Sequence, residues 1–473
     1  MYINGKWIES QDKIKVINPA NGKLVDFVPV VTKNEVRKAI DAADKAFEDW
    51  SSLSAAKRAS YLYKVAELME KKKDDLAYIA TLEMGKALND MKGEIQSAID
   101  YVQWYAEEAQ RVYGETIPSK RNKVVNVIKQ PVGVVGAITP WNFPVSMITR
   151  KIAPAISVGC TVVLKPSSSS PLSAKFICEI FEEVGIPDGV VNIILGNSKD
   201  ISNELLENSK VRKMSFTGST SVGKNLIEGS AKTVKKLSLE LGGHAPFIVF
   251  EDANIDMAVQ QLVNGKFRCS GQACVSMNRI YIQRSIEKEF VFKLNKQVKS
   301  LTLGNGLNPE TQVGPLVNSS GLQKVENQVN DAISKGANVT IGGKRSLTEE
   351  HKNGFFFEPT VLTNVNEEMY ISHEETFGPV APIFTFDTEE EVIKKANNTP
   401  FGLASYFYTN DLSRSHRVAR KLDFGIVGLN DAHPISASVP FGGIKESGYG
   451  KEGGHHGLNE YLIEKLISTV YER

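Results

Sequence analysis

The middle of the chain alternates short runs of β-branched residues with a stretch of helical periodicity. The runs "TVVLKPS" (161–167), "GVVNIILG" (189–196) and "RKMSFTGS" (212–219) all contain Gly, Pro or Ser at their ends, and "PLSAKFICEIFEEVG" (171–185) separates the first two. This alternation is typical of βαβ units around a parallel sheet. The same rhythm over residues 246–431 predicts a second α/β lobe.

The N-terminal part of the chain has helical rather than strand periodicity. The segments "EVRKAIDAADKAFEDW" (35–50) and "EIQSAIDYVQWYAEEAQRVY" (94–113) repeat apolar residues at the spacing of one helix face. A helix with one apolar face has to bury that face against another element. We therefore expect these helices to cover the first sheet.

Length, charge and cysteine content narrow the class of protein. A chain of 473 residues, 41% of them hydrophobic, is too long for one core and predicts two or three domains. Lys and Arg total 56 against 55 for Asp and Glu, so no global charge favours nucleic acid or an anionic membrane, and a small-molecule partner is expected. Four cysteines, no apolar segment of about 18 residues and no signal-peptide pattern indicate a cytoplasmic protein. The seven histidines show no HExxH-like spacing, so no metal site is predicted.

Two stretches match phosphate-binding patterns. "GYGKEG" (448–453) fits GxGxxG, but a glycine-interrupted loop rather than a strand precedes it, so we interpret it as a turn. "GSTSVGKN" (218–225) lies between a predicted strand and helix and resembles a P-loop, except that Asn225 replaces the Ser or Thr that holds Mg²⁺. A phosphotransferase is therefore the second hypothesis. A more general hypothesis is that Gly218 and Ser219 bind a phosphate or pyrophosphate group. The alternative is that they form a strand-to-helix turn that binds no ligand.

The stretch "SGQACVSMNR" (270–279) raises the question of whether Cys274 is a nucleophile or a buried thiol. A catalytic thiol needs donors for a developing oxyanion and a base for water. Asn142 in "TPWNFP" could donate to the oxyanion, or it could simply cap a turn. Glu240 in "SLELGG" could act as the base, or it could be a surface charge. Cys269 is interpreted as a packed thiol rather than as a redox partner.

Five motifs together resemble the NAD(P)-dependent aldehyde dehydrogenase superfamily. "TPWNFP", "LELGG", "GQACVSMNR", "EETFGPV" and "PFGGIKESGYG" occur in that family's order and approximate spacing, over nearly the whole chain. The resemblance implies an α/β fold with a cofactor domain (1–112 and 131–242), a catalytic domain (243–441) and a β oligomerisation arm (113–130 and 442–473). It also implies a homodimer or homotetramer.

The resemblance assigns a reaction to these residues. Cys274 would attack an aldehyde carbon, and the oxyanion would be held by the Asn142 amide and the Cys274 backbone N–H. Hydride transfer to nicotinamide would leave a thioester, and Glu240 would activate the water that hydrolyses it. Glu452 in "GKEGG" is either a second carboxylate in a proton path or a surface charge.

The resemblance also indicates the cofactor residues. Ser168 stands where NAD-preferring members often carry a glutamate that would repel a 2′-phosphate, so NADP is favoured over NAD. The other expected contacts are Lys165 to the adenosine ribose, Gly218 and Ser219 to the pyrophosphate, Glu375 and Phe377 to the nicotinamide ribose, and Trp141.

Two segments point to a substrate class. "SMITRK" and "KFRCSGQ" resemble succinate-semialdehyde dehydrogenases, in which arginines at the positions of Arg150 and Arg268 face the substrate carboxylate. Structural salt bridges are the alternative for both. The serine that helps to bind the carboxylate in that subfamily falls on Ile435, with Ser436 and Ser438 nearby. Succinate semialdehyde is the predicted substrate, and lactaldehyde, glyceraldehyde or another short aldehyde is the alternative.

Overall fold

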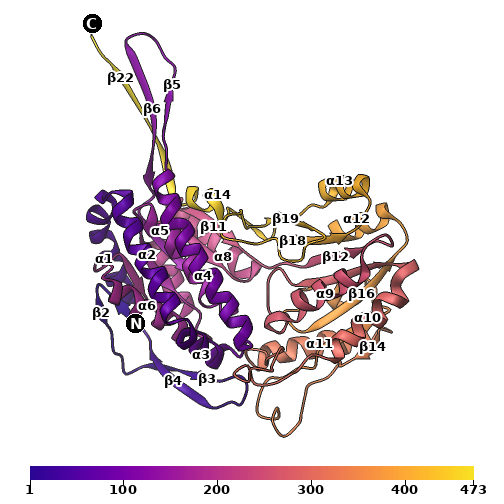
Figure 1. Cartoon of the computed structure of the whole chain (residues 1–473). Coiled ribbons are helices and arrows are strands. Elements are labelled where there is room, and N and C mark those ends of the chain that lie inside the picture. Colours follow the sequence, from indigo (N-terminus) through magenta and orange to yellow (C-terminus); the bar gives the residue numbers. More distant parts are fainter. Residues whose placement is uncertain (473) are drawn as a thin grey trace.

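The computed structural model describes residues 1–472. Two α/β lobes stand side by side, and a thin β arm projects from the N-terminal lobe and ends near the C-terminus (Figure 1). The predicted α/β fold with two largely parallel sheets is confirmed. Within the described residues, no helix is both long enough and apolar enough to cross a membrane.

The N-terminal lobe is built on an eight-stranded sheet. In spatial order its strands are β2 (Lys6–Trp7), β1 (Tyr2–Ile3), β9 (Val191–Ile193), β8 (Thr161–Lys165), β7 (Val134–Ile138), β10 (Val211–Thr217), β11 (Lys236–Glu240) and β21 (Gly448–Tyr449). The five from β9 to β11 are parallel. From β7 the chain moves outward through β8 and β9, then returns to the other side of β7 with β10. Such a reversal leaves a crevice at the carboxyl ends of β7 and β10, where α/β folds bind ligands.

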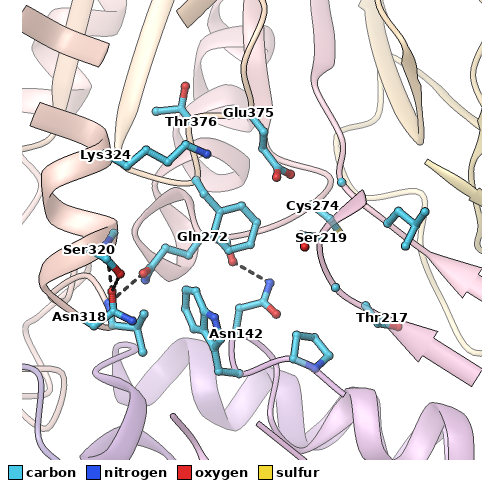
Figure 2. A pocket seen from close by; sticks show the side chains of 18 of the residues that line it. Asn142, Thr217, Ser219, Gln272, Cys274, Asn318, Ser320, Lys324, Glu375 and Thr376 are labelled. Carbon is cyan, nitrogen blue, oxygen red and sulfur yellow. Dashed lines mark hydrogen bonds between the residues drawn. The ribbon is translucent and has the colours of Figure 1, made fainter. Parts of the chain in front are cut away.

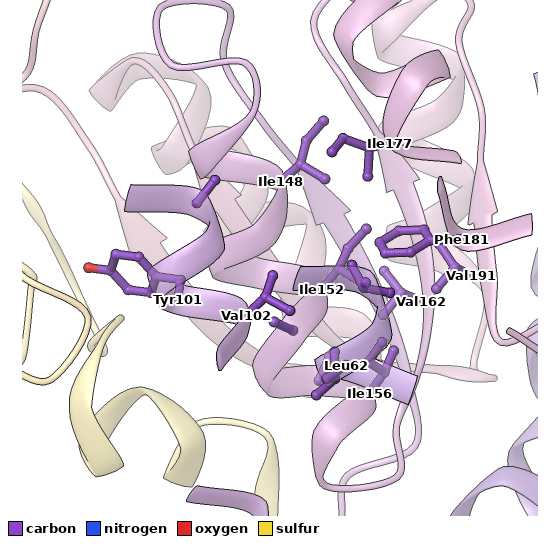
Figure 3. Packing of buried hydrophobic residues seen from close by; sticks show 14 of the residues in the cluster. Leu62, Tyr101, Val102, Ile148, Ile152, Ile156, Val162, Ile177, Phe181 and Val191 are labelled. Carbon is purple, nitrogen blue, oxygen red and sulfur yellow. The ribbon is translucent and has the colours of Figure 1, made fainter. Parts of the chain in front are cut away.

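Helices cover both faces of this sheet because its strands are apolar on both sides. Val162 and Leu164 pack on one face and Val163 on the other. Figure 3 shows the first of these two clusters, between the strands and the helices that cover them. On that face lie α2 (Ala55–Lys71), α3 (Lys73–Met84), α4 (Leu88–Glu108), α5 (Ser146–Ser157) and α6 (Pro171–Val184); on the other lie α1 (Lys33–Ser52), α7 (Ser198–Glu207) and α8 (Thr220–Ser230). The predicted helices at 35–50, 94–113 and 171–185 correspond to α1, α4 and α6.

The C-terminal lobe repeats this design with seven strands. In spatial order they are β14 (Asn338–Ile341), β15 (Thr360–Thr363), β16 (Val380–Phe386), β13 (Met277–Gln283), β12 (Ala245–Val249), β18 (Ala404–Tyr408) and β19 (Ile426–Leu429), and only the β14–β15 pair is antiparallel. One face is covered by α9 (Ile255–Phe267) and α10 (Glu287–Lys299), and the other by α11 (Ser319–Ser334), α12 (Glu389–Asn397) and α13 (Leu412–Lys421).

The arm is a three-stranded antiparallel sheet. Its strands, in spatial order, are β22 (Leu462–Val470), β6 (Lys123–Pro131) and β5 (Glu115–Ile117). All residues of β22 except the first are exposed. Between the C-terminal lobe and β22 lie β20 (Ile444–Lys445), which pairs with β17, β21, which pairs with β11, and α14 (Gly454–Asn459).

Short elements complete the fold. They are β3 (Lys13–Ile17), β4 (Leu24–Pro29), β17 (Phe401–Gly402) and the 3-10 turns η1 (Ala109–Arg111), η2 (Ala231–Thr233), η3 (Arg268–Gly271), η4 (Arg284–Ile286) and η5 (Tyr370–Ser372).

Candidate active site

A cavity of about 570 Å³ opens at the crevice beside β7 and β10. The loop after β7, the turn after β10 and segments of the C-terminal lobe form its walls (Figure 2). It is large enough for part of an extended ligand, and it joins the two lobes. Seven of the predicted residues line it: Trp141, Asn142, Gly218, Ser219, Cys274, Glu375 and Phe377.

The loop that carries Cys274 has an unusual backbone. Cys269, Ser270 and Gly271 adopt positive φ angles of 51°, 55° and 73° in succession. A side chain on Gly271 would also clash with the carbonyl oxygen of Gly378, so this position needs glycine. A strained loop of this kind persists only when its surroundings hold it. The loop therefore presents Cys274 to the cavity in a fixed position.

The Cys274 thiol is protonated in this arrangement. Burial raises its pKa to about 12, the nearby carboxyl groups of Glu375 and Glu240 raise it further in the same direction, and Arg150 acts against them. The thiolate is the nucleophilic form of cysteine. Attack by Cys274 therefore needs a group that accepts the thiol proton.

Asn142 lies across the cavity from the Cys274 loop and is bonded to it. Its side-chain Nδ2 donates to the Gln272 carbonyl oxygen at 2.9 Å (Figure 2). An amide nitrogen carries two N–H donors. One donor fixes the Asn142 side chain, and the other is available to an oxyanion in the cavity.

Glu240 ends β11 and is almost fully buried. Its Oε2 has no hydrogen-bond partner among residues 1–472, and a side chain on Gly442 would lie 2.7 Å from its Oε1. Burial, followed by the nearby Glu452 carboxylate, raises the pKa of Glu240 well above its usual range. Its neighbours Leu241 and Gly242 line the cavity, whereas Glu240 itself lies behind the lining.

A buried ion cluster backs Glu240. The Lys151 ammonium donates to Glu452 at 2.6 Å, and the Arg150 guanidinium lies 3.8 Å from the same carboxylate. Arg150 is also held between the rings of Tyr101 and Phe441, at 4.6 and 4.7 Å. Of the two alternatives for Glu452, the structure excludes a surface charge, because only 5% of Glu452 is exposed.

Comparison with known proteins agrees with this geometry. The model of the aldehyde dehydrogenase family matches residues 7–467. The chain belongs to this family. A glutarate-semialdehyde dehydrogenase of Pseudomonas putida is 49% identical, and the match covers 98% of this chain and 96% of that protein. An NADP(+)-dependent succinate-semialdehyde dehydrogenase of Escherichia coli is 48% identical with the same coverage.

Solved structures of similar proteins have the same fold as this chain. The crystal structure of an E. coli NADP-dependent enzyme superposes with a TM-score of 0.97 at 47% identity, covering 99% of this chain and 98% of that one. The succinate-semialdehyde dehydrogenase of Burkholderia pseudomallei superposes with a TM-score of 0.97 at 44% identity, covering 99% and 97%. The predicted aldehyde dehydrogenase with an NAD(P) cofactor is thereby confirmed, and the chain is an NAD(P)-dependent oxidoreductase.

The remaining cofactor candidates of this aldehyde dehydrogenase lie on strand and helix ends next to the cavity. Lys165 ends β8, and its ammonium donates only to the Pro166 carbonyl oxygen, at 3.3 Å; burial lowers its pKa. Ser168 is exposed in the turn before α6, and residues 165–170 contain no acidic side chain. Ser219 caps α8, whose first N–H groups face the crevice end of the sheet. These positions fit an anionic dinucleotide.

Lys224 of the P-loop-like stretch and the GxGxxG match at 448–453 lie outside the main cavity. The Lys224 ammonium of the P-loop-like stretch pairs with the exposed Glu446 at 3.0 Å and does not line the cavity. Gly448 of the GxGxxG match lies in β21 and packs against the Leu239 carbonyl on the edge of the sheet. The aldehyde dehydrogenase therefore has no phosphotransferase site at Lys224.

A second, smaller cavity lies on the other side of the nucleophile. It measures about 100 Å³ and is lined by Phe143, Ala273 and Val275, the neighbours of Asn142 and Cys274 in the chain. Arg268 and Ile435 also line it. Arg268 further borders an outer cavity of about 580 Å³ that includes Asp90 and Asn264. We call these the inner and the outer cavity.

The two candidate arginines differ in their partners. Arg150 forms the ion pair with Glu452, which is the structural alternative foreseen for it, and it lines neither the inner nor the outer cavity. Arg268 has no hydrogen bond or ion pair within residues 1–472, and its guanidinium lies 5.7 Å from the Phe143 ring. Ser436 and Ser438 are bonded to each other at 3.1 Å and lie outside both cavities.

Several residues that line the main cavity were not found from the sequence. Gln272 lies within a recognised motif but was given no role, although its Oε1 accepts from the Val317 backbone at 3.0 Å. Lys324 comes from the middle of α11, where the sequence shows only helical periodicity. Asn318 and Thr376 are also part of the lining. Only the folded arrangement brings α11 next to Cys274.

Proposed function

We propose that this aldehyde dehydrogenase oxidises succinate semialdehyde to succinate, with Cys274 as the nucleophile. The observation that carries the proposal is the unpaired Arg268 guanidinium in the inner cavity beside Cys274. An arginine that lacks a carboxylate partner in the protein is suited to bind one on a substrate. A relative of that activity at 48% identity supports the same choice.

The reaction begins at Cys274. Its thiol gives up a proton to a base and attacks the aldehyde carbon, and the new C–S bond makes a thiohemiacetal oxyanion. The free N–H of the Asn142 amide and the Cys274 backbone N–H donate to this oxygen, which lowers the barrier in a site with little water. Collapse of the oxyanion to the Cys274 thioester releases a hydride from this carbon, and a nicotinamide cofactor held in the main cavity would supply the acceptor for it.

Glu240 completes the cycle. Burial, followed by the Glu452 carboxylate, raises the pKa of Glu240, which makes its carboxylate a stronger base toward water. Its carboxylate takes a proton from water as that water attacks the thioester carbon. The C–S bond then breaks, succinate leaves, and the proton returns to the Cys274 sulfur. Lys151 and Arg150 hold the Glu452 charge in place behind Glu240.

For the cofactor, NADP⁺ is preferred to NAD⁺. Ser168 is exposed beside Lys165 and carries a hydroxyl where a carboxylate would repel the 2′-phosphate. Lys165, whose ammonium has one protein partner, supplies a positive charge there. Gly218 and Ser219 would hold the pyrophosphate, and Glu375 and Phe377 would contact the nicotinamide ribose. Trp141 and Phe377, whose rings meet edge to face at 5.6 Å, form a wall of this site.

Glutarate semialdehyde is the second candidate, because a relative of that name is 49% identical. It is one methylene longer than succinate semialdehyde. One methylene in an apolar pocket changes the discrimination between substrates by about 10- to 200-fold. The preference between succinate semialdehyde and glutarate semialdehyde is therefore large enough to measure as a difference in kcat/KM.

The enzyme assembles as a homodimer or homotetramer through its arm. β22 is an edge strand with exposed Leu466, Ile467 and Val470, and such an edge favours pairing with another chain. The domains are cofactor (1–112 and 131–242), catalytic (243–441) and arm, with the arm's last strand from Leu462. All four cysteines are free thiols, which fits the cytoplasm. Light scattering on a size-exclusion column tests the assembly, and a monomer would contradict it.

A kinetic panel tests the reaction. Succinate semialdehyde, glutarate semialdehyde, lactaldehyde, glyceraldehyde and butanal are each assayed with NADP⁺ and NAD⁺, and reduced nicotinamide is followed by absorbance. The highest kcat/KM is expected for succinate semialdehyde with NADP⁺. Butanal has the same carbon count without the carboxylate. Equal kcat/KM for butanal and succinate semialdehyde would overturn the proposed substrate.

A further inference from the structure

A histidine shares both substrate-side cavities with Arg268. His433 follows β19 and lines the inner and the outer cavity, as Arg268 does. The His433 backbone N–H donates to the Asp431 side chain at 2.8 Å, which fixes the loop. The ring lies beside α9, because its Cε1 would be 3.8 Å from a Cβ added at Gly265. The imidazole is thus held beside the guanidinium.

The inner cavity has few polar groups. Three of its lining side chains carry a hydrogen-bonding group: those of Arg268, Tyr406 and His433. The Tyr406 hydroxyl donates to the Val275 carbonyl oxygen at 3.0 Å, so its proton is already used. Neither ring nitrogen of His433 has a hydrogen-bond partner within residues 1–472. Arg268 and His433 are therefore the free donors of this cavity, and a ligand's acceptor oxygens would bind there.

We propose that His433 determines specificity for the carboxylate end of the substrate, by donating a ring N–H to one carboxylate oxygen while Arg268 binds the other. This assignment deepens the proposed function and rests on it. Ile435, two residues further along the same loop, lines the inner cavity with an apolar side chain and donates nothing. The imidazole thus supplies the second donor that a carboxylate of two oxygens needs.

The charges around His433 favour a neutral ring. Burial, then the Arg268 charge, lowers its pKa, and Asp431 acts against them; Asp90 also borders the outer cavity. A neutral imidazole still has one N–H donor. In this arrangement Arg268 provides the positive charge, and His433 provides a directional N–H donor that orients the carboxylate. An aldehyde without a carboxylate gains nothing from either group.

The test compares variants of the full-length enzyme with two aldehydes. His433→Leu keeps much of the side-chain volume and removes the donor, whereas His433→Gln keeps an N–H. With NADP⁺, His433→Leu is expected to raise KM for succinate semialdehyde about tenfold, because one hydrogen bond to a charged group is lost. KM for butanal is expected to stay within about twofold of the wild-type value. His433→Gln is expected to retain most of the wild-type KM. Ser438→Ala, on the same loop but outside both cavities, serves as the matched control.

A double variant distinguishes the loss of the donor from misfolding of the His433→Leu protein. Ile435→Ser introduced into His433→Leu places a hydroxyl donor in the inner cavity, and it is expected to recover part of the lost affinity for succinate semialdehyde. If His433→Leu changes KM for both aldehydes equally, or for neither, the inference is overturned. If the wild-type enzyme does not prefer succinate semialdehyde to butanal, the proposed function itself fails. The two failures are therefore distinguishable.

Discussion

The main cavity, which Cys274 lines, and the inner cavity, which its neighbours Ala273 and Val275 line, differ in the groups that form their walls. On the cofactor side, backbone turns at the ends of strands form much of the wall, as at Gly218 and Gly242. On the substrate side, the polar character comes from individual side chains, those of Arg268 and His433. The cofactor side follows from the topology of the sheet, whereas the substrate side depends on a few residues that can change without changing the fold. The following substitutions test this division.

Removing the nucleophile should have the largest effect and should leave the cofactor side intact. In Cys274→Ala no thiohemiacetal can form, so kcat is expected to fall at least about 10⁴-fold. NADP⁺ affinity, measured by isothermal titration calorimetry, should stay within about twofold. Cys178→Ala, a buried thiol in α6 far from the cavity, is the control and should keep its kcat. Full turnover by Cys274→Ala would remove the thiol from the mechanism.

The substrate side should respond to charge in a way that depends on the aldehyde. Arg268→Leu is expected to lower kcat/KM for succinate semialdehyde about 100-fold, because it removes a two-pronged contact to the carboxylate. Butanal should change less than about threefold. Arg150→Met, which breaks the buried pair with Glu452, should impair both aldehydes alike. The assignment is wrong if Arg268→Leu has the same effect on both substrates.

The cofactor side should be sensitive to one added charge. Ser168→Glu places a carboxylate where the 2′-phosphate is expected, and it should raise KM for NADP⁺ about tenfold by repulsion. KM for NAD⁺ should remain within about twofold or fall. Ser167→Glu, the neighbouring substitution, gives a comparison for a general charge effect. Parallel changes with both cofactors would place the 2′-phosphate elsewhere.

The smallest expected effect is on the reactivity of the Cys274 thiol. It tests whether a carboxyl group on the cofactor side, that of Glu375, raises the pKa of this thiol. With a pKa of about 12, the thiolate fraction of Cys274 grows about tenfold per pH unit between pH 7 and pH 10, and alkylation by iodoacetamide should follow it without levelling off. Glu375, on the cofactor side, raises that pKa, so Glu375→Gln should speed alkylation a few-fold at pH 8. The exposed Glu374→Gln is the control. A plateau in the rate below pH 9 would show that the thiol is already ionised there.

The sequence predicted the parts of the site that depend on residue type. Cys274, Asn142 and Glu240 were recognisable because thiol chemistry needs a nucleophile, an oxyanion donor and a base, and each occurs in a motif. The parallel sheet of the N-terminal lobe was also predicted, from the alternation of strands and helices. These features depend on local patterns, which a single sequence displays.

The residues missed by the sequence depend on packing between distant segments. Lys324 of α11 lines the main cavity with Cys274, and His433 of the loop after β19 lines the inner and outer cavities, and no local sequence pattern indicates either position. The roles of Glu452 and Arg150 stayed open for the same reason: only burial distinguishes a surface charge from an ion cluster.

The bonds between the two lobes at the nucleophile loop bear on what aligns the nucleophile. The Asn142 amide, from the N-terminal lobe, donates to Gln272, and the Cys269 backbone N–H donates to Asp90 of that lobe at 3.1 Å. A chain with one lobe folded therefore has a sheet and a core but no aligned nucleophile. Alignment of the nucleophile is therefore a property of the docked pair of lobes and not of either lobe alone.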